Sequence, residues 1–165
     1  MANGNSFALL GTDLGLTRYV GTASTLPLEV ADSWSSLDLG VRVGGRGGLR
    51  AYAAALDLAT VSGRANLGQA LILRLLTPLG SLAHLAHPEF GSRLVELIGE
   101  LNNATTRNRA RLYTLEALAQ EPRVREVLDL VVETTPDQAD VVRIAFSVLP
   151  VGDDEPFALA LEVTL

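Results

Sequence analysis

The sequence predicts an α+β fold, in which a three-helix segment is followed by a C-terminal antiparallel β-meander and preceded by an N-terminal extension of strands and loops. Three observations predict it. Apolar residues recur at helical spacing between residues 64 and 120, and they alternate at strand spacing from Val124 to Leu165. The change falls at Glu121-Pro122-Arg123, because proline lacks the N–H that a helix needs and keeps the preceding residue out of the helical conformation.

The composition indicates about one folded domain. The chain has 165 residues, of which 48% are hydrophobic and 19% are charged, and its mean hydropathy is +0.27. Because this composition is more apolar than that of a typical lone soluble domain, we expect partners to cover part of the surface. We assign residues 1–62 to the N-terminal extension and residues 63–165 to a core domain with its helices first and its sheet last.

Charge and cysteine content exclude several classes of protein. The formal net charge is −6, which argues against a general nucleic-acid binder, since such proteins neutralise phosphates with lysine and arginine. Without cysteine the chain has no disulfide framework and no zinc-thiolate site. The sequence shows neither a signal peptide nor an apolar run of about 18 residues. We therefore expect no membrane insertion, and folding in the cytoplasm.

The first third of the chain is rich in glycine, serine and threonine. Two strands are predicted, from Ser6 to Leu10 and from Leu37 to Val43, the second by its alternation of apolar with other residues. The glycine cluster at residues 44–48 predicts a turn, because no Lys-Ser/Thr follows it as a phosphate loop would require. The segment from Leu49 to Val61 fits a helix or an extended segment, and the sequence leaves both open.

Three helices are predicted next. The first begins near Arg64 and ends at Thr77-Pro78, the second spans residues 92–101 after a turn at His87-Pro88, and the third spans residues 105–120. Apolar residues spaced three and four apart predict the faces that pack in the core. These faces are Leu67, Ala70, Leu71, Arg74 and Leu75 with Ile72 and Leu76 in the first helix, Leu94, Leu97, Ile98 and Leu101 in the second, and Leu112, Leu115 and Leu118 or Ala119 in the third.

Arginines crowd the start of the third predicted helix. Arg107, Arg109 and Arg111 lie in its first two turns, where the helix dipole favours acidic side chains. Either these arginines are solvated at small cost or a partner supplies carboxylates. All thirteen basic residues other than histidine are arginines, which fits interface ion pairs or simply the codon bias of a GC-rich genome.

Three strands close the chain, from Val124 to Val132, from Val141 to Val148 and from Phe157 to Leu165. Short loops join them, so they form an antiparallel meander with two edges. We expect no later segment to cover the edge of the last strand. An uncovered apolar edge promotes aggregation unless another chain's strand pairs with it, so this edge is a candidate interaction site.

Residue types that could support catalysis or metal binding are few. His84 and His87 lack the further ligands that a metal site needs. Three glutamates could supply a glycosidase's pair of carboxylates, but carboxylates on a helix are ordinarily solvated. They are Glu89, Glu96 and Glu100. The Asp153-Asp154-Glu155 turn indicates solubility rather than a metal loop. We therefore expect no enzyme and no cofactor.

An ordered set of short motifs covers roughly residues 60 to 165. It comprises Asn66-Leu-Gly-Gln-Ala70, Arg74-Leu-Leu-Thr-Pro-Leu-Gly80, His87-Pro-Glu-Phe-Gly-Ser92, Glu121-Pro-Arg-Val124 and the closing strands. This set resembles the GPW-like baseplate wedge family of contractile phage tails, also called baseplate assembly protein W. The family has counterparts in type VI secretion systems, R-type pyocins and extracellular contractile injection systems.

The resemblance implies a structural baseplate subunit that joins the wedge scaffold to the first sheath ring. Its sheet, similar to the strand-exchanging part of sheath subunits, would accept extended sheath arms and so initiate sheath assembly by β-strand augmentation. We expect Phe157, Leu159, Leu161 and Val163 to serve this role. Six copies per particle, and contacts with tube or hub proteins, are further implications.

The resemblance also implies that Glu121, Pro122 and Arg123 dock on the helical core bundle of the wedge scaffold. The alternative is a local brace, in which these residues only stabilise the turn from helix to strand. The family has carried the label "lysozyme-like", so a peptidoglycan-degrading enzyme is one alternative function, and an unrelated small adaptor is another. Two departures limit the comparison. Ser81 stands where many members have an acidic residue, and the first sixty residues have no counterpart in short phage members.

Overall fold

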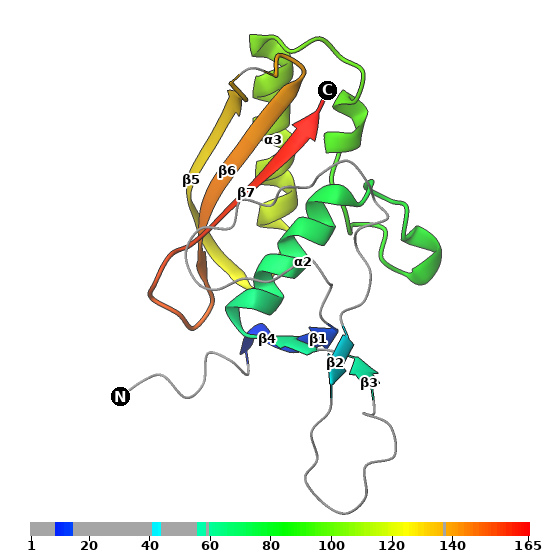
Figure 1. Cartoon of the computed structure of the whole chain (residues 1–165), viewed down its shortest axis with the longest axis vertical. Helices are drawn as coiled ribbons and strands as arrows, with labels where there is room; N and C mark the ends of the chain where they lie inside the picture. The colour runs from blue at the N-terminus through cyan, green and yellow to red at the C-terminus, as the bar shows by residue number, and fades with distance from the viewer. Residues whose placement is uncertain (1–8, 15–40, 44–55, 59, 137) are drawn as a thin grey trace, which may run out of the picture.

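The computed structural model describes residues 9–14, 41–43, 56–58, 60–136 and 138–165. Its largest sheet is a three-stranded antiparallel meander in the order β5 (Val124–Thr134), β6 (Val141–Pro150) and β7 (Phe157–Thr164). Helices α2 (Arg64–Leu76) and α3 (Ala104–Ala119) pack against one face of this sheet (Figure 1). The C-terminal β-meander that the sequence predicted is therefore confirmed.

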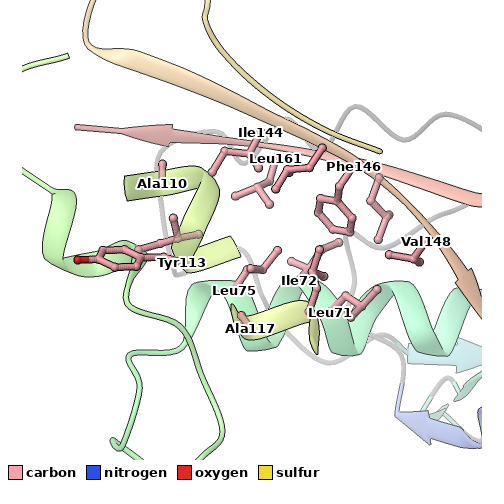
Figure 2. Close-up of a cluster of buried hydrophobic side chains, with 14 of the residues drawn as sticks. Leu71, Ile72, Leu75, Ala110, Tyr113, Ala117, Ile144, Phe146, Val148 and Leu161 are labelled. Atoms are coloured by element: carbon pink, nitrogen blue, oxygen red, sulfur yellow. The ribbon is translucent and has the colours of Figure 1, made fainter. Parts of the chain in front are cut away.

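The alternation of residues along β6 creates the core face of the sheet. In register, β6 pairs with both neighbours, and its residues at even numbers point toward the helices. Figure 2 shows side chains of α2 and α3 meeting those of the sheet in a single cluster. The buried sheet residues are Leu130, Val142, Ile144, Phe146, Val148, Leu159 and Leu161.

Helix α2 begins and ends where its sequence requires. Gly63 precedes it with φ of 64°, a conformation that glycine adopts without strain. At the other end, the hydroxyl of Thr77 donates to the carbonyl of Leu73 at 2.6 Å, and Pro78 cannot continue the helix. The apolar face predicted for this helix lies in the core, with Leu67 and Leu71 0% exposed.

Helix α3 has the expected bounds but a different buried face. Asn103 caps its start by accepting from the N–H of Thr106 at 3.0 Å. Leu118 is buried as predicted, whereas Leu112 is 51% exposed and Leu115 is 37% exposed, so that part of the prediction is wrong. Small residues and one aromatic residue face the core instead: Thr106, Ala110, Tyr113, Thr114 and Ala117.

The predicted three-helix segment is also wrong, because residues 92–101 do not form an α-helix. They contain one short 3-10 turn, η3 (Leu94–Leu97), which ends at Ile98 in an extended conformation before Gly99 at φ of 87°. This single turn buries Leu94 and Leu97, which are three residues apart. The last predicted core residue, Leu101, is 82% exposed.

Two small antiparallel ribbons lie at the end of the molecule where α2 begins (Figure 1). One pairs β1 (Thr12–Leu14) with β4 (Thr60–Ser62), and the other pairs β2 (Val41–Val43) with β3 (Leu56–Leu58). The described residues of the ambiguous segment before Gly63 are thus extended. Strand β1 was not predicted.

Other predictions for the first third can be compared only in part. In the strand predicted from Leu37, residues 41–43 are described and are extended, and the remainder lies outside the described residues. Leu9 and Leu10 are helical rather than extended, and residues 6–8 and the glycine cluster lie outside the described residues. None of the helices in the described segments combines the length and the apolar composition that crossing a bilayer requires.

Candidate functional site

The Glu121-Pro122-Arg123 corner follows α3 directly and turns the chain into β5. Glu121 donates its N–H to the carbonyl of Leu118 at 3.2 Å, and its own carbonyl accepts from Val124 at 3.0 Å. These bonds form a tight turn between the last residues of the helix and the first of the strand. The Glu121 side chain is only 4% exposed, so the turn directs this carboxylate into the protein.

Two arginines hold the buried carboxylate of Glu121. Nε of Arg123 lies 2.6 Å from Oε1, and Nη2 of Arg74, from helix α2, lies 3.4 Å from Oε2. Burial alone would raise the pKa of Glu121, but the hydrogen bonds and charge of Arg123, with the charge of Arg74, outweigh it and hold this pKa below its ordinary value. The carboxylate is therefore ionised at neutral pH and its charge is matched within the chain.

Arg74 links this corner to the segment between α2 and α3. Its side chain is 9% exposed, its guanidinium carbon lies 4.6 Å from the centre of the Phe90 ring, and Nη1 donates to the carbonyl of Glu89 at 3.4 Å. Its Nε is buried and has no hydrogen-bond partner among the described residues. A partly satisfied arginine of this kind stabilises the fold only while its counterion, Glu121, is in place.

The same segment closes on itself beside Arg74. Ser92 donates its N–H to the carbonyl of Thr77 at 2.8 Å, and Leu79 donates to the carbonyl of Ser92 at 2.9 Å. Gly91 directly precedes Ser92 and has a φ of 119°. An added Cβ there would come within 2.6 Å of the Thr77 carbonyl oxygen. Only glycine fits there, which explains the Phe-Gly sequence at this position.

The motif segments that were far apart in the sequence therefore meet at one place. We call Arg74, Phe90, Gly91, Glu121 and Arg123 the corner cluster. Sequence reasoning found the charged pair but not Arg74, although an arginine within the apolar face of α2 was the available signal. The local-brace alternative describes what the side chain of Glu121 does in this structure. Pro122 is exposed and the Arg123 side chain is 27% exposed, so docking through these two residues stays a prediction.

The predicted residues of β7 divide into buried and partly buried side chains. Leu159 is 3% exposed and Leu161 is 1% exposed, both within the core, and Phe157 and Val163 pack against it. These side chains are thus used by the protein's own core. What β7 offers to a partner is its backbone.

The hydrogen-bonding pattern of β7 identifies its free backbone groups. Leu165 donates to the carbonyl of Asp140 at 2.8 Å, and these two residues are opposite each other just beyond the last β6–β7 pair. Hydrogen-bonded pairs alternate with non-hydrogen-bonded pairs in antiparallel sheets. The residues that direct their N–H and C=O groups away from β6 are therefore Ala158, Ala160, Glu162 and Thr164.

The two edges of the sheet differ in how well they are protected. Strand β5 has two register irregularities and four exposed charged side chains, those of Arg125, Glu126, Asp129 and Glu133. Bulges and charges of this kind discourage pairing with another strand. Strand β7 has eight consecutive pairs with β6, no irregularity and a single charged residue, Glu162. No described residue outside β6 donates to or accepts from the backbone of β7.

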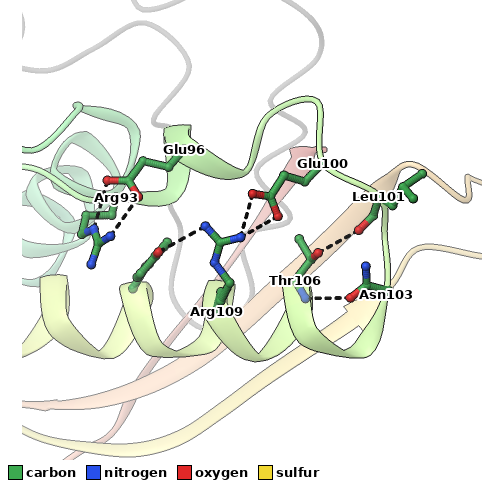
Figure 3. A network of polar contacts seen from close by, with 8 residues as sticks. Arg93, Glu96, Glu100, Leu101, Asn103, Thr106 and Arg109 are labelled. Carbon is green, nitrogen blue, oxygen red and sulfur yellow. Dashed lines mark hydrogen bonds and ion pairs between the residues drawn. The ribbon is translucent and has the colours of Figure 1, made fainter.

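Of the three glutamates considered for acid–base catalysis, Glu96 and Glu100 lie in a network between η3 and α3 (Figure 3). Both carboxylate oxygens of Glu96 accept from Arg93 at 3.0 Å, and Glu100 accepts from Arg109 at 2.7 Å. The hydrogen bond from Arg93 holds the pKa of Glu96 below its ordinary value. A general acid needs the opposite shift. Of the arginines at the start of α3, Arg109 therefore has its carboxylate from Glu100 of the same chain.

Metal-binding groups do not gather in the described part of the chain. Among those residues, no three His, Cys, Asp or Glu side chains lie close enough to hold one ion. His84 and His87 are both exposed on the segment between α2 and α3.

The geometry defines a two-layer α+β fold with a buried ionic corner and one regular sheet edge, that of β7, with which no described residue outside β6 pairs. The chain is similar in structure to a "putative tail lysozyme" from Geobacter sulfurreducens, with a TM-score of 0.51 and 22% sequence identity over 61% of this chain and 88% of that chain. At this identity the likeness establishes a shared fold. No protein-family model and no curated protein matches the chain.

Proposed function

We propose that this chain is a structural baseplate subunit of a contractile phage tail or injection system, joining the wedge scaffold to the first sheath ring. The observation that carries the proposal is the regular edge of β7, with which no described residue outside β6 pairs. Two others support it: the fold is shared with a protein named for a phage tail, and the motifs that resemble the baseplate wedge family converge at the corner cluster.

In the proposed mechanism, an extended arm of a sheath subunit pairs with β7. The outward N–H and C=O groups of Ala158, Ala160, Glu162 and Thr164 form the hydrogen bonds, and alternate side chains of the arm give specificity. The contacts of one subunit are weak, but repeated around a ring, in six copies, they act together. The exposed parts of Pro122 and Arg123 would contact the wedge scaffold, and tube or hub proteins are further partners.

The test removes one hydrogen-bond donor from the free edge. Ala160→Pro deletes an N–H that points away from β6, so the β6–β7 pairing is kept and the subunit folds. We expect the variant to lose most of its binding to the cognate sheath protein in a co-purification experiment, and sheath assembly to fail. Thr134→Pro, placed at an outward position of the β5 edge, is the matched control and should bind normally.

Normal sheath assembly with a folded Ala160→Pro variant would contradict augmentation at β7. Loss of assembly with Thr134→Pro alone would move the proposed site to the β5 edge. Circular dichroism of both variants separates these outcomes from unfolding.

A peptidoglycan-degrading enzyme is the second candidate, since the structural neighbour is named as a tail lysozyme. The arrangement of Glu96 and Glu100, each paired with an arginine, disfavours it. Incubation of the purified chain with peptidoglycan, followed by assay of released reducing ends, decides the matter. Activity that disappears in Glu96→Gln or Glu89→Gln would replace the structural proposal by an enzymatic one.

A further inference from the structure

The outer face of α3 carries leucines that its own core does not use. Ala110 and Ala117 point toward the sheet and α2, as Figure 2 shows, and the Tyr113 ring packs against Arg93 beside η3. Leu112 and Leu115 lie on the opposite side of the helix, 51% and 37% exposed. A neighbouring leucine pair on a helix surface, turned away from the core, is typical of a helix that pairs with another helix.

The spacing along this face is that of a coiled-coil seam. Exposed positions recur at alternating intervals of three and four residues, which places Leu112 at an a position and Leu115 at a d position. The same seam runs over two heptads, and the residues at its ends are small or short enough for helices to approach closely. The complete seam is Thr105, Asn108, Leu112, Leu115 and Ala119.

Charged side chains of opposite sign flank the leucine pair. Arg111 occupies a g position on one side, and Glu116 occupies the following e position on the other. Both are exposed. Arg107 and Arg109 bond to Asn102 and Glu100, but Arg111 makes no hydrogen bond or ion pair with the described part of the chain.

The positions of these charges select one arrangement of two helices. In a parallel pair, a residue at g faces the e residue five positions later on the partner helix, so Arg111 of each chain faces Glu116 of the other. In an antiparallel pair, g faces g and e faces e, which would place like charges together. The seam is therefore complementary to a second copy of itself only when the helices run in parallel.

We infer that two copies of this chain associate through α3, side by side and in parallel, about a two-fold axis along the helices. Leu112 and Leu115 pack on their counterparts, and two Arg111–Glu116 ion pairs flank them. The core faces of the two helices then point in opposite directions, which leaves room for both domains. Because the contact is two heptads long, the dimer is weak and exchanges with monomer. This inference does not depend on the proposed function.

Sedimentation equilibrium of the purified full-length chain, over concentrations up to about 0.5 mM, tests the association. We expect a reversible monomer–dimer equilibrium that Leu112→Glu abolishes. Leu101→Glu is the matched control, since Leu101 is 82% exposed and lies outside the seam, and it should leave the dimer intact. A wild-type chain that stays monomeric overturns the inference, as does a dimer that Leu112→Glu leaves unchanged.

A charge exchange tests the flanking pairs without touching the apolar seam. Arg111→Glu and Glu116→Arg alone should each weaken the dimer by roughly tenfold, because each sets like charges against each other. The double variant, with both changes, should restore most of the affinity. Failure of the double variant to recover would rule out the parallel arrangement.

The absence of cysteine from the sequence allows a direct test of orientation. In a parallel pair Asn108 lies opposite Asn108, so Asn108→Cys should form a disulfide-linked dimer under mild oxidation. Glu126→Cys, on the exposed surface of β5, is the control and should not crosslink. An Asn108→Cys chain that crosslinks only when mixed with Ala119→Cys would indicate an antiparallel pair. An Asn108→Cys chain that forms no disulfide-linked dimer, alone or mixed with Ala119→Cys, would overturn pairing of α3 with a second copy.

Discussion

Glu121 is the residue on which the ionic corner depends. Replacing it by glutamine keeps the shape but removes the charge, which leaves Arg74 buried without a counterion. We predict that Glu121→Gln lowers the free energy of unfolding by about 3 kcal/mol, measured by urea denaturation at pH 7. Glu126→Gln, an exposed glutamate of β5, is the control and should change the value by less than about 0.5 kcal/mol.

The pKa of Glu121 fixes the sign of the pH dependence of this contribution. Because the folded pKa lies below the unfolded one, the stabilisation is present above the unfolded value of about 4.3 and is lost as pH falls through the folded value. The difference between wild type and Glu121→Gln should therefore shrink in acid. A difference that stayed constant down to pH 3 would contradict an origin in the ionised carboxylate.

At the residue scale, the sequence predicted the corner but not its internal partner. The proline and its charged neighbours were recognisable because they are adjacent in the chain, and their effect on helix geometry is local. Arg74 lies 47 residues from Glu121 in sequence, so their pairing depends on how α2 packs beside α3. No local pattern reports that packing.

At the scale of elements, sequence periodicity located α2, α3 and the meander, yet it misassigned the buried face of α3. Leucines are the expected core residues, but Thr114 is buried because its hydroxyl donates to the carbonyl of Ala110 at 2.8 Å. Alanines and threonines on that face let α3 approach β5 closely. Periodicity alone could not choose between this face and the leucine face.

Two ion pairs of Arg64 join the start of α2 to the β6–β7 loop. Nε of Arg64 lies 2.6 Å from Oδ2 of Asp153, and Nη2 of Arg64 lies 3.0 Å from Oε2 of Glu155. The hydrogen bond from Arg64 lowers the pKa of Asp153 to about 2. The sequence suggested only a solubilising turn here, since Arg64 is 89 residues away.

We predict that Asp153→Asn lowers the free energy of unfolding by about 1 kcal/mol at pH 7, with allowance for solvent screening. Since the folded pKa is depressed, this contribution is complete above about pH 4 and is lost as pH falls toward 2. Urea denaturation at pH 7 and pH 2 should therefore show a difference between the two proteins only at the higher pH. Asp154→Asn is the control, because the Asp154 side chain is 98% exposed. An equal loss in both variants at both pH values would contradict a stabilising ion pair between Arg64 and Asp153.

At the scale of the whole molecule, part of the N-terminal third belongs to the core. Leu10 is 1% exposed within the main hydrophobic cluster, and its carbonyl accepts from Asn66 at 2.8 Å and from Arg123 at 3.3 Å. The side chain of Gln69 reaches the carbonyl of Leu14 at 2.8 Å. The division of the chain at residue 62 stays a prediction, but these contacts give it a measurable consequence. Sequence patterns could not reveal them, because each of these bonds joins residues at least 55 positions apart in the chain.

We predict that a fragment of residues 63–165 is less stable than the full chain by about 3 to 5 kcal/mol, from the lost burial of Leu10 and the exposed or unsatisfied groups left behind. Asn66, which is 4% exposed, is one such group. Its side-chain amide donates to the carbonyl of Leu10, and the fragment lacks that carbonyl. Urea denaturation of both chains measures the difference.

Asn66→Leu makes that prediction specific to the contact with Leu10. In the full chain the substitution removes a satisfied buried hydrogen bond and leaves the Leu10 carbonyl unpaired on that side, so it should destabilise. In the fragment it replaces an unsatisfied amide by an apolar side chain of similar size, so it should stabilise. The effect of one substitution must therefore change sign between the two chains. A fragment as stable as the full chain, with Asn66→Leu destabilising both, would mean that residues 63–165 form a self-sufficient domain and that Leu10 is dispensable to it.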